Sequence, residues 1–152
     1  MQRDILVYLA VGILVAVLIF SNGELMPKTI YDRIAQAIMQ FEGYFVGSLS
    51  YRNNNPGNLR FAGQAGTVGQ DANGFAIFQN FQDGYDALID QLRLAFTGAS
   101  RVYKPSMSLY EFFATYAPAK DSNHPKEYAE FVAQQLGVMP NMTLATIAQH
   151  TA

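Results

Sequence analysis

One carboxylate stands among aromatic side chains in this sequence, and its setting favours proton-transfer chemistry. Glu42 is flanked by three aromatic residues, Phe41, Tyr44 and Phe45, and the next acidic residue along the chain is Asp71. Apolar surroundings disfavour the ionised form of a carboxyl group and raise its pKa, so Glu42 can hold a proton near neutral pH. A protonated carboxyl group of this kind can act as the general acid in glycoside cleavage.

Glycoside cleavage usually needs a second carboxylate, which acts as a nucleophile or a base. Between Glu42 and Asp71 the polar side chains are Ser, Asn, Arg, Gln, Thr and Tyr, with no acid among them. Either the second carboxylate comes from a distant segment, with Asp71, Asp83 and Asp86 as candidates, or the reaction does not need one.

Helical periodicity places Glu42 at the end of a helix. Apolar residues recur at steps of four and three after Thr29, at Ile30, Ile34, Ile38 and Phe41. Gly43 is a natural stop for this helix. The C-terminal end of a helix is its negative end, so a carboxylate there is unfavourable and invites a functional explanation.

The rest of the chain predicts a mainly α fold with a small β-hairpin, of the α+β class. Two short runs rich in aromatic or β-branched residues, LRFAG (59–63) and GFAIFQ (74–79), predict the hairpin. Spacing, caps and proline positions predict further helices over about 81–97, 108–116, 125–136 and 143–149.

The N-terminal segment contains an apolar run, Ile5 to Phe20, without a charged residue. As a helix it would cover about 24 Å, slightly less than the roughly 30 Å hydrocarbon core of a bilayer. We expect residues 1–23 to form an uncleaved single-pass anchor in a lipid membrane, followed by a domain over 24–152. A cleaved signal peptide and a buried core helix are the alternatives.

Composition argues against several other classes of protein. The net charge is −2, and the ten Lys and Arg residues are scattered, whereas nucleic-acid binding normally needs a basic stripe. The chain has no Cys, and its two His residues, His124 and His150, have no partner at ligand spacing. We therefore expect no metal site, no cofactor and no nucleic-acid partner.

Three blocks in order resemble phage and prophage domains of the lysozyme superfamily, on the side of lytic transglycosylases and goose-type lysozymes. The blocks are FEGYFVGSLSYRNNNPGNLRF, GFAIFQNFQDGYDAL and FFATYAPAKDSNHPKEYAEFVAQQLGV, and the resemblance covers roughly residues 30–140. It implies a lysozyme-like fold that cleaves the β-1,4 bond between N-acetylmuramic acid and N-acetylglucosamine in peptidoglycan, with Glu42 as general acid.

The resemblance also favours transglycosylation over hydrolysis. In lytic transglycosylases one glutamate acts first as acid and then as base, and the 6-hydroxyl of the muramic sugar attacks to form a 1,6-anhydro ring. Phage muramidases of another type carry an aspartate about nine residues after the glutamate, where this chain reads YRNNN. Goose-type hydrolysis stays open, because its auxiliary aspartates come from loops.

Four further residues are expected to bind the glycan. GFAIFQ lies where relatives carry a Gly-Leu-Met-Gln block, which implies that Gln79 contacts sugar, although Phe78 replaces the methionine. TYAPA lies where relatives carry Ala-Tyr-Asn-Ala-Gly, which implies that the Tyr116 hydroxyl points towards Glu42, although Ala117 replaces the asparagine. Asn55 and Asn58 flank Pro56-Gly57 and could hydrogen-bond N-acetyl and hydroxyl groups.

Each of these assignments has a structural alternative. Asparagine runs commonly shape turns, because Asn tolerates left-handed backbone and bonds its own main chain. Tyr116 could equally be a core residue. The whole domain could be a non-catalytic glycan-binding or structural module. As an enzyme, it would be a virion-associated protein that opens the wall locally, or an envelope enzyme, held in a virion internal membrane or the bacterial inner membrane.

Overall fold

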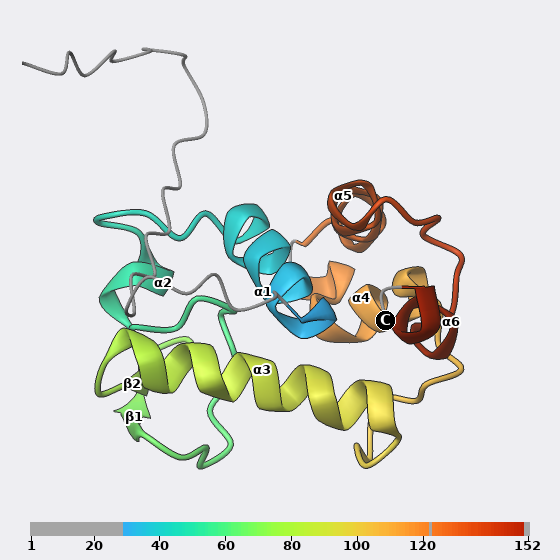
Figure 1. The fold of residues 1–152 in the computed structure, drawn as a ribbon. Helices are drawn as coiled ribbons and strands as arrows, with labels where there is room; N and C mark the ends of the chain where they lie inside the picture. The colour runs from blue at the N-terminus through green and yellow to red at the C-terminus, as the bar shows by residue number, and fades with distance from the viewer. Residues whose placement is uncertain (1–28, 122, 151–152) are drawn as a thin grey trace, which may run out of the picture.

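The computed structural model describes residues 29–121 and 123–150, which form a mainly helical fold with one small antiparallel sheet (Figure 1). Its elements, in chain order, are α1 (Ile30–Phe41), α2 (Leu49–Arg52), β1 (Thr67–Gln70), β2 (Ala76–Phe78), α3 (Phe81–Thr97), α4 (Leu109–Tyr116), the 3₁₀ turn η1 (Ala119–Asp121), α5 (Pro125–Leu136) and α6 (Leu144–His150). The sheet lies near the N-terminal end of α3, and α4, α5 and α6 gather towards its other end.

Local sequence signals set the helix ends, as expected. The side chains of Thr29 and Ser108 each accept a hydrogen bond from a backbone N–H of the first turn, and Asp32 and Glu111 complete the two capping boxes. The prediction for α3 is confirmed over its full length, and the helix ends at Gly98 in the left-handed conformation.

The predicted hairpin is half right. β2 forms within 74–79, but it pairs with β1, which lies in the Gly- and Gln-rich stretch between the two predicted strands. Residues 59–63 do not form the predicted strand; they contact the β2 segment through an isolated bridge between Arg60 and Phe75 and through the Ala76 N–H, which donates to Leu59 O. The pairing has a register shift between Thr67 and Gly69, where Gly69 has φ 158°.

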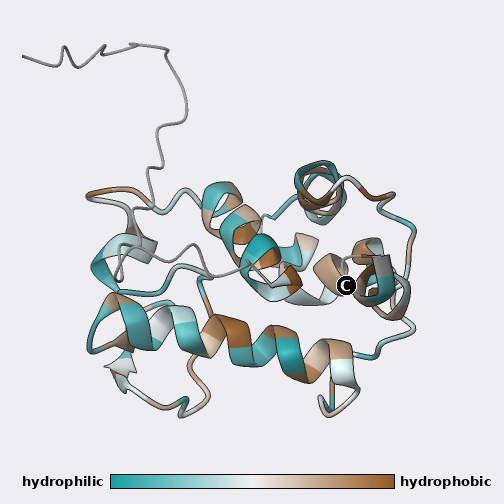
Figure 2. Ribbon diagram, in the orientation of Figure 1, coloured by the Kyte–Doolittle hydropathy of each residue, from teal (hydrophilic) through white to brown (hydrophobic). Residues whose placement is uncertain are grey.

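The core lies between the inward faces of α1, α3, α4 and α5. Apolar positions concentrate on these faces, and the exposed side of α3 carries polar residues together with the exposed Leu94 (Figure 2). An apolar stripe at helical spacing on α3 is buried throughout: Tyr85, Leu88, Ile89, Leu92 and Phe96. The short helix α2 was not predicted, because four residues are too few to establish a helical period.

The anchor or signal segment over residues 1–23 lies outside the described residues. Within 29–121 and 123–150, every helix is too short or too polar to cross a bilayer.

Candidate active site

Glu42 is the residue that caps the C-terminal end of α1. Its backbone N–H still donates to Ile38 O, and Gly43, with φ 65°, then turns the chain away from the helix axis. The left-handed backbone at Gly43 explains why glycine follows the carboxylate directly. The helix end thus presents the half-buried Glu42 side chain to the space between α1, the 53–58 turn and α5.

Two neutral groups hold the Glu42 carboxylate. Asn58 Nδ2 donates to Oε2 at 2.7 Å, and the Tyr128 hydroxyl donates to Oε1 at 2.8 Å. Burial raises the pKa of Glu42 above its ordinary value, and the hydrogen bonds from Asn58 and Tyr128 oppose part of that rise. The Glu42 carboxyl group therefore has the raised pKa that suits a proton donor, and two hydrogen-bond donors stabilise its ionised form.

The 53–58 turn aims Asn58 at Glu42. The Asn58 N–H donates to Asn55 O, and the Asn58 backbone adopts the left-handed conformation with φ 46°, which asparagine tolerates. The neighbouring Gly57 carbonyl accepts the Tyr116 hydroxyl. A Cβ atom at Gly57 would lie 2.8 Å from Tyr116 Oη and 2.9 Å from Leu88 Cδ1, so glycine is needed for this close approach.

Tyr128 is a residue of the candidate site that the sequence patterns do not indicate. Its ring lies between Phe41 and Phe113, with centroid distances of 3.9 and 4.2 Å and interplanar angles of 20° in both pairs. Sequence periodicity correctly places Tyr128 on the inward face of α5, where it is 1% exposed. The available signal was its hydroxyl, because a buried tyrosine usually has a hydrogen-bond partner.

A cleft of about 670 Å³ opens at Glu42. Asn58, Gln91, Tyr103 and Tyr116 contribute polar groups to its wall, and the loop after α4 closes one side. Among the described residues that line it, Glu42 is the only acid, and Arg60 and Lys120 are the bases. No cluster of three or more potential metal ligands occurs in the described ranges.

Asn55, expected to contact the glycan, lies inside the fold. Its side chain is 0% exposed, its Nδ2 donates to Leu59 O and Ala76 O, both at 2.9 Å, and its Oδ1 accepts the Leu59 N–H at 2.8 Å. Asn55 thus joins the turn to β2 and has no surface for a sugar. Asn53 and Asn54 likewise bond within the fold, to Asp71 Oδ2 and Phe78 O.

Gln79 and Tyr116 also differ from expectation. Gln79 is exposed between β2 and α3 and does not line the cleft, so the structure does not bring it to Glu42. Tyr116 lines the cleft, but its hydroxyl donates to Gly57 O instead of Glu42. The tyrosine that contacts the carboxylate comes from α5, and Tyr116 acts one step away by fixing the turn that carries Asn58.

None of the candidate second carboxylates lines the cleft with Glu42. Asp71 accepts the backbone N–H groups of Asn73 and Phe75 and so closes the turn before β2. Asp83 and Asp86 lie on α3, on the wall of a different cavity. The structure therefore leaves Glu42 without an acidic neighbour among the described cleft residues.

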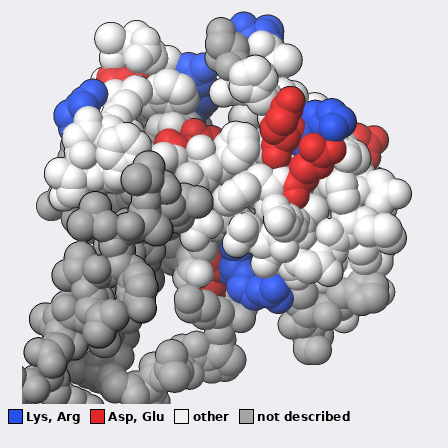
Figure 3. All heavy atoms as spheres, turned by 90° about the horizontal axis from the view of Figure 1, so that it is seen from above, with Lys and Arg blue, Asp and Glu red and all other residues white. Residues whose placement is uncertain are grey.

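Charges elsewhere on the surface form small separate groups. On the face shown in Figure 3, Lys and Arg side chains do not form a continuous stripe.

Tyr128→Phe is expected to move the pH dependence of activity to higher pH. The substitution keeps the ring between Phe41 and Phe113 but removes the donor to Oε1, so the pKa of Glu42 rises further. If Glu42 acts as a general acid, the alkaline limb of kcat/KM should shift to higher pH. A limb that stays in place or moves to lower pH would contradict this role for Tyr128.

No protein-family model matches the chain, and the searches for similar curated proteins and similar solved structures also gave no match.

Proposed function

We propose that this protein is a lytic transglycosylase with a lysozyme-like fold that cleaves the bond between N-acetylmuramic acid and N-acetylglucosamine in peptidoglycan. One observation carries the proposal: a half-buried glutamate with a raised pKa opens into a large cleft, and its only hydrogen-bond partners shown are neutral. A single carboxyl group fits a reaction in which one residue gives and then takes back a proton.

The reaction has two proton transfers. Protonated Glu42 donates its proton to the glycosidic oxygen as the C1–O bond breaks, and the resulting carboxylate is stabilised by Asn58 Nδ2 and the Tyr128 hydroxyl. The carboxylate then accepts the proton of the muramic 6-hydroxyl as O6 bonds to C1. The anhydro ring forms, Glu42 is protonated again, and no water is consumed.

A membrane-held enzyme of this class would act close to the wall. The apolar run over 5–20 supports a lipid anchor, with the domain facing peptidoglycan from a virion internal membrane or the bacterial inner membrane. Local wall penetration by a phage particle is the role that fits an anchored peptidoglycan-cleaving domain.

Product analysis tests the proposal. The full-length protein, purified in mild detergent, is incubated with peptidoglycan sacculi, and the soluble products are analysed by mass spectrometry beside those of Glu42→Gln. We expect anhydro-muropeptides from the native protein alone. Reducing-end products would replace the proposal with goose-type hydrolysis, and the absence of products from the native protein would leave a non-catalytic glycan-binding module.

A further inference from the structure

A second cavity, which we call the α3 groove, runs along the outer side of α3 and has a volume of about 530 Å³. The groove and the catalytic cleft share four wall residues, Ala62, Gln64, Gln91 and Tyr103. The groove and the cleft therefore lie next to each other and meet at these four residues.

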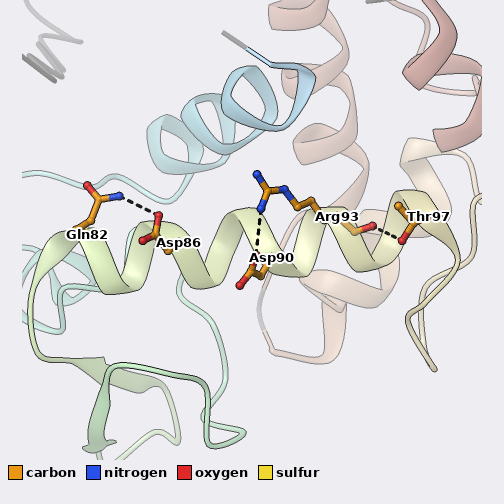
Figure 4. A network of polar contacts seen from close by, with 5 residues as sticks. All are labelled: Gln82, Asp86, Asp90, Arg93 and Thr97. Atoms are coloured by element: carbon orange, nitrogen blue, oxygen red, sulfur yellow. Dashed lines mark hydrogen bonds and ion pairs between the residues drawn. The ribbon is translucent and has the colours of Figure 1, made fainter. Parts of the chain in front are cut away.

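The wall of the groove combines apolar side chains with negative charge. Ala87, Leu94 and Val102 supply apolar surface, and Leu94 and Val102 are 48% and 57% exposed. Three aspartates of α3 complete the wall: Asp83, Asp86 and Asp90. Among the described residues, no Lys or Arg belongs to this wall. Figure 4 shows Asp86 and Asp90 along α3, where Gln82 donates to Asp86 and Arg93 pairs with Asp90 at 3.5 Å.

We propose that the α3 groove binds the peptide attached to the muramic acid residue whose glycosidic bond lies at Glu42, and that it favours peptides carrying an ammonium group. The inference rests on the proposed function, because it names the substrate of the same site as a peptide-bearing glycan instead of a bare sugar chain.

Continuity with the cleft identifies the occupant. A glycan in the cleft carries its peptide on the lactyl group of muramic acid, so the peptide must leave the cleft sideways. The α3 groove begins at residues that already line the cleft and provides such an exit. Gln64 is held at this junction, since its Nε2 donates to Arg60 O and its Oε1 accepts the Ala62 N–H.

The two cavities carry charges of opposite sign, which suits a substituent that has both a positive and a negative group. Arg60 and Lys120 line the cleft, whereas the groove wall has carboxylates alone among its described charged residues. Aliphatic parts of a diamino side chain can lie on Leu94 and Val102 while its ammonium group faces Asp86 and Asp90. Such exposed ion pairs contribute modestly to affinity, roughly threefold for each carboxylate.

Kinetics with two matched substrates test the groove. Glycan strands that keep their peptides are compared with the same strands after an amidase has removed the peptides, using full-length protein. We expect a lower KM on the peptide-bearing strands. Replacing two groove carboxylates together, Asp86→Asn with Asp90→Asn, should raise that KM about tenfold at low salt and leave the KM for bare strands unchanged.

A second variant tests whether the open volume of the α3 groove is needed, independently of the charge of its wall. Ala65 is exposed on the groove wall, so Ala65→Trp fills the groove without touching the core and should also raise KM on peptide-bearing strands alone. The matched controls are Glu127→Gln on α5 and Ala114→Trp on α4, both exposed and outside the two walls, and neither should alter KM.

Two results would overturn the inference: equal KM values for the two substrates with native protein, or groove variants that impair both substrates alike. Binding to Glu42→Gln protein separates this failure from failure of the proposed function. If the native protein cleaves nothing, the transglycosylase proposal falls. The peptide site is still supported if peptide-bearing strands bind more tightly than bare strands and the groove variants lose this difference. Equal binding of peptide-bearing and bare strands would contradict the peptide site.

Discussion

Glu42→Gln is expected to lower the rate of peptidoglycan cleavage by roughly 10²–10⁴-fold, the usual contribution of general acid–base catalysis. Glutamine has nearly the same shape as glutamate but has no proton to donate at any working pH. Its carbonyl oxygen can accept from Asn58, and its amide can donate to the Tyr128 hydroxyl in place of the present contact. The cleft should therefore keep its form while the rate of cleavage falls.

The stability of the same variant provides an independent check. The folded state raises the pKa of Glu42, so it binds more protons than the unfolded state and the stability of native protein falls as pH rises through the raised value. Glu42→Gln removes this dependence. Denaturant unfolding should thus show the variant gaining stability relative to native protein from about pH 4.3 upward.

Exposed Glu127→Gln is the matched control for both measurements, and it should change neither activity nor the pH dependence of stability by much. Full cleavage activity in Glu42→Gln would exclude Glu42 as the acid. Loss of activity together with unfolding at every pH would show a structural role instead.

Gly84→Ala is expected to destabilise the fold by about 3 kcal/mol, because it overpacks the contact between α3 and the 53–58 turn. A Cβ atom at Gly84 would lie 1.9 Å from Asn54 O and 3.1 Å from Pro56 Cδ. The obstructing oxygen belongs to backbone that is itself held, since the Asn54 N–H donates to Tyr51 O. The roughly 1 kcal/mol that alanine contributes to helix propensity does not offset this clash.

Activity should fall in Gly84→Ala beyond the loss of folded protein, because the displaced turn also carries Asn58. Urea unfolding measures the stability, and kcat/KM per folded molecule measures the displacement. Gln82→Ala, at an exposed position of the same helix, is the control and should stay within about 0.5 kcal/mol of native protein. An equally stable Gly84→Ala would mean that α3 and the turn are not in close contact.

The helices were predictable because their signals are local. Capping boxes at Thr29 and Ser108, Gly98 after α3 and Pro125 at the start of α5 each act within a few residues of the helix end that they set. β1 was not predictable in this way. Its pairing with β2 depends on contacts across a turn, and its four residues, TVGQ, are a short run interrupted by a glycine, which strands disfavour.

The asparagines of the 53–58 turn show where prediction from residue type ends. Asn55 and Asn58 have the same side chain and lie three residues apart, yet one is buried against Leu59 and Ala76 and the other reaches Glu42. The backbone conformation of the turn decides this difference, and Tyr116, from α4, helps to hold that turn through Gly57.

The sequence alone determined that one carboxylate would end a helix among aromatic residues, because helical period and a following glycine are local properties. Only the tertiary structure decided which groups meet that carboxylate. Asn58 and Tyr128 lie 16 and 86 residues from Glu42 along the chain. Their contacts follow from the packing of α1 against α5 and the path of the turn, and packing between distant segments leaves no periodic trace in a sequence.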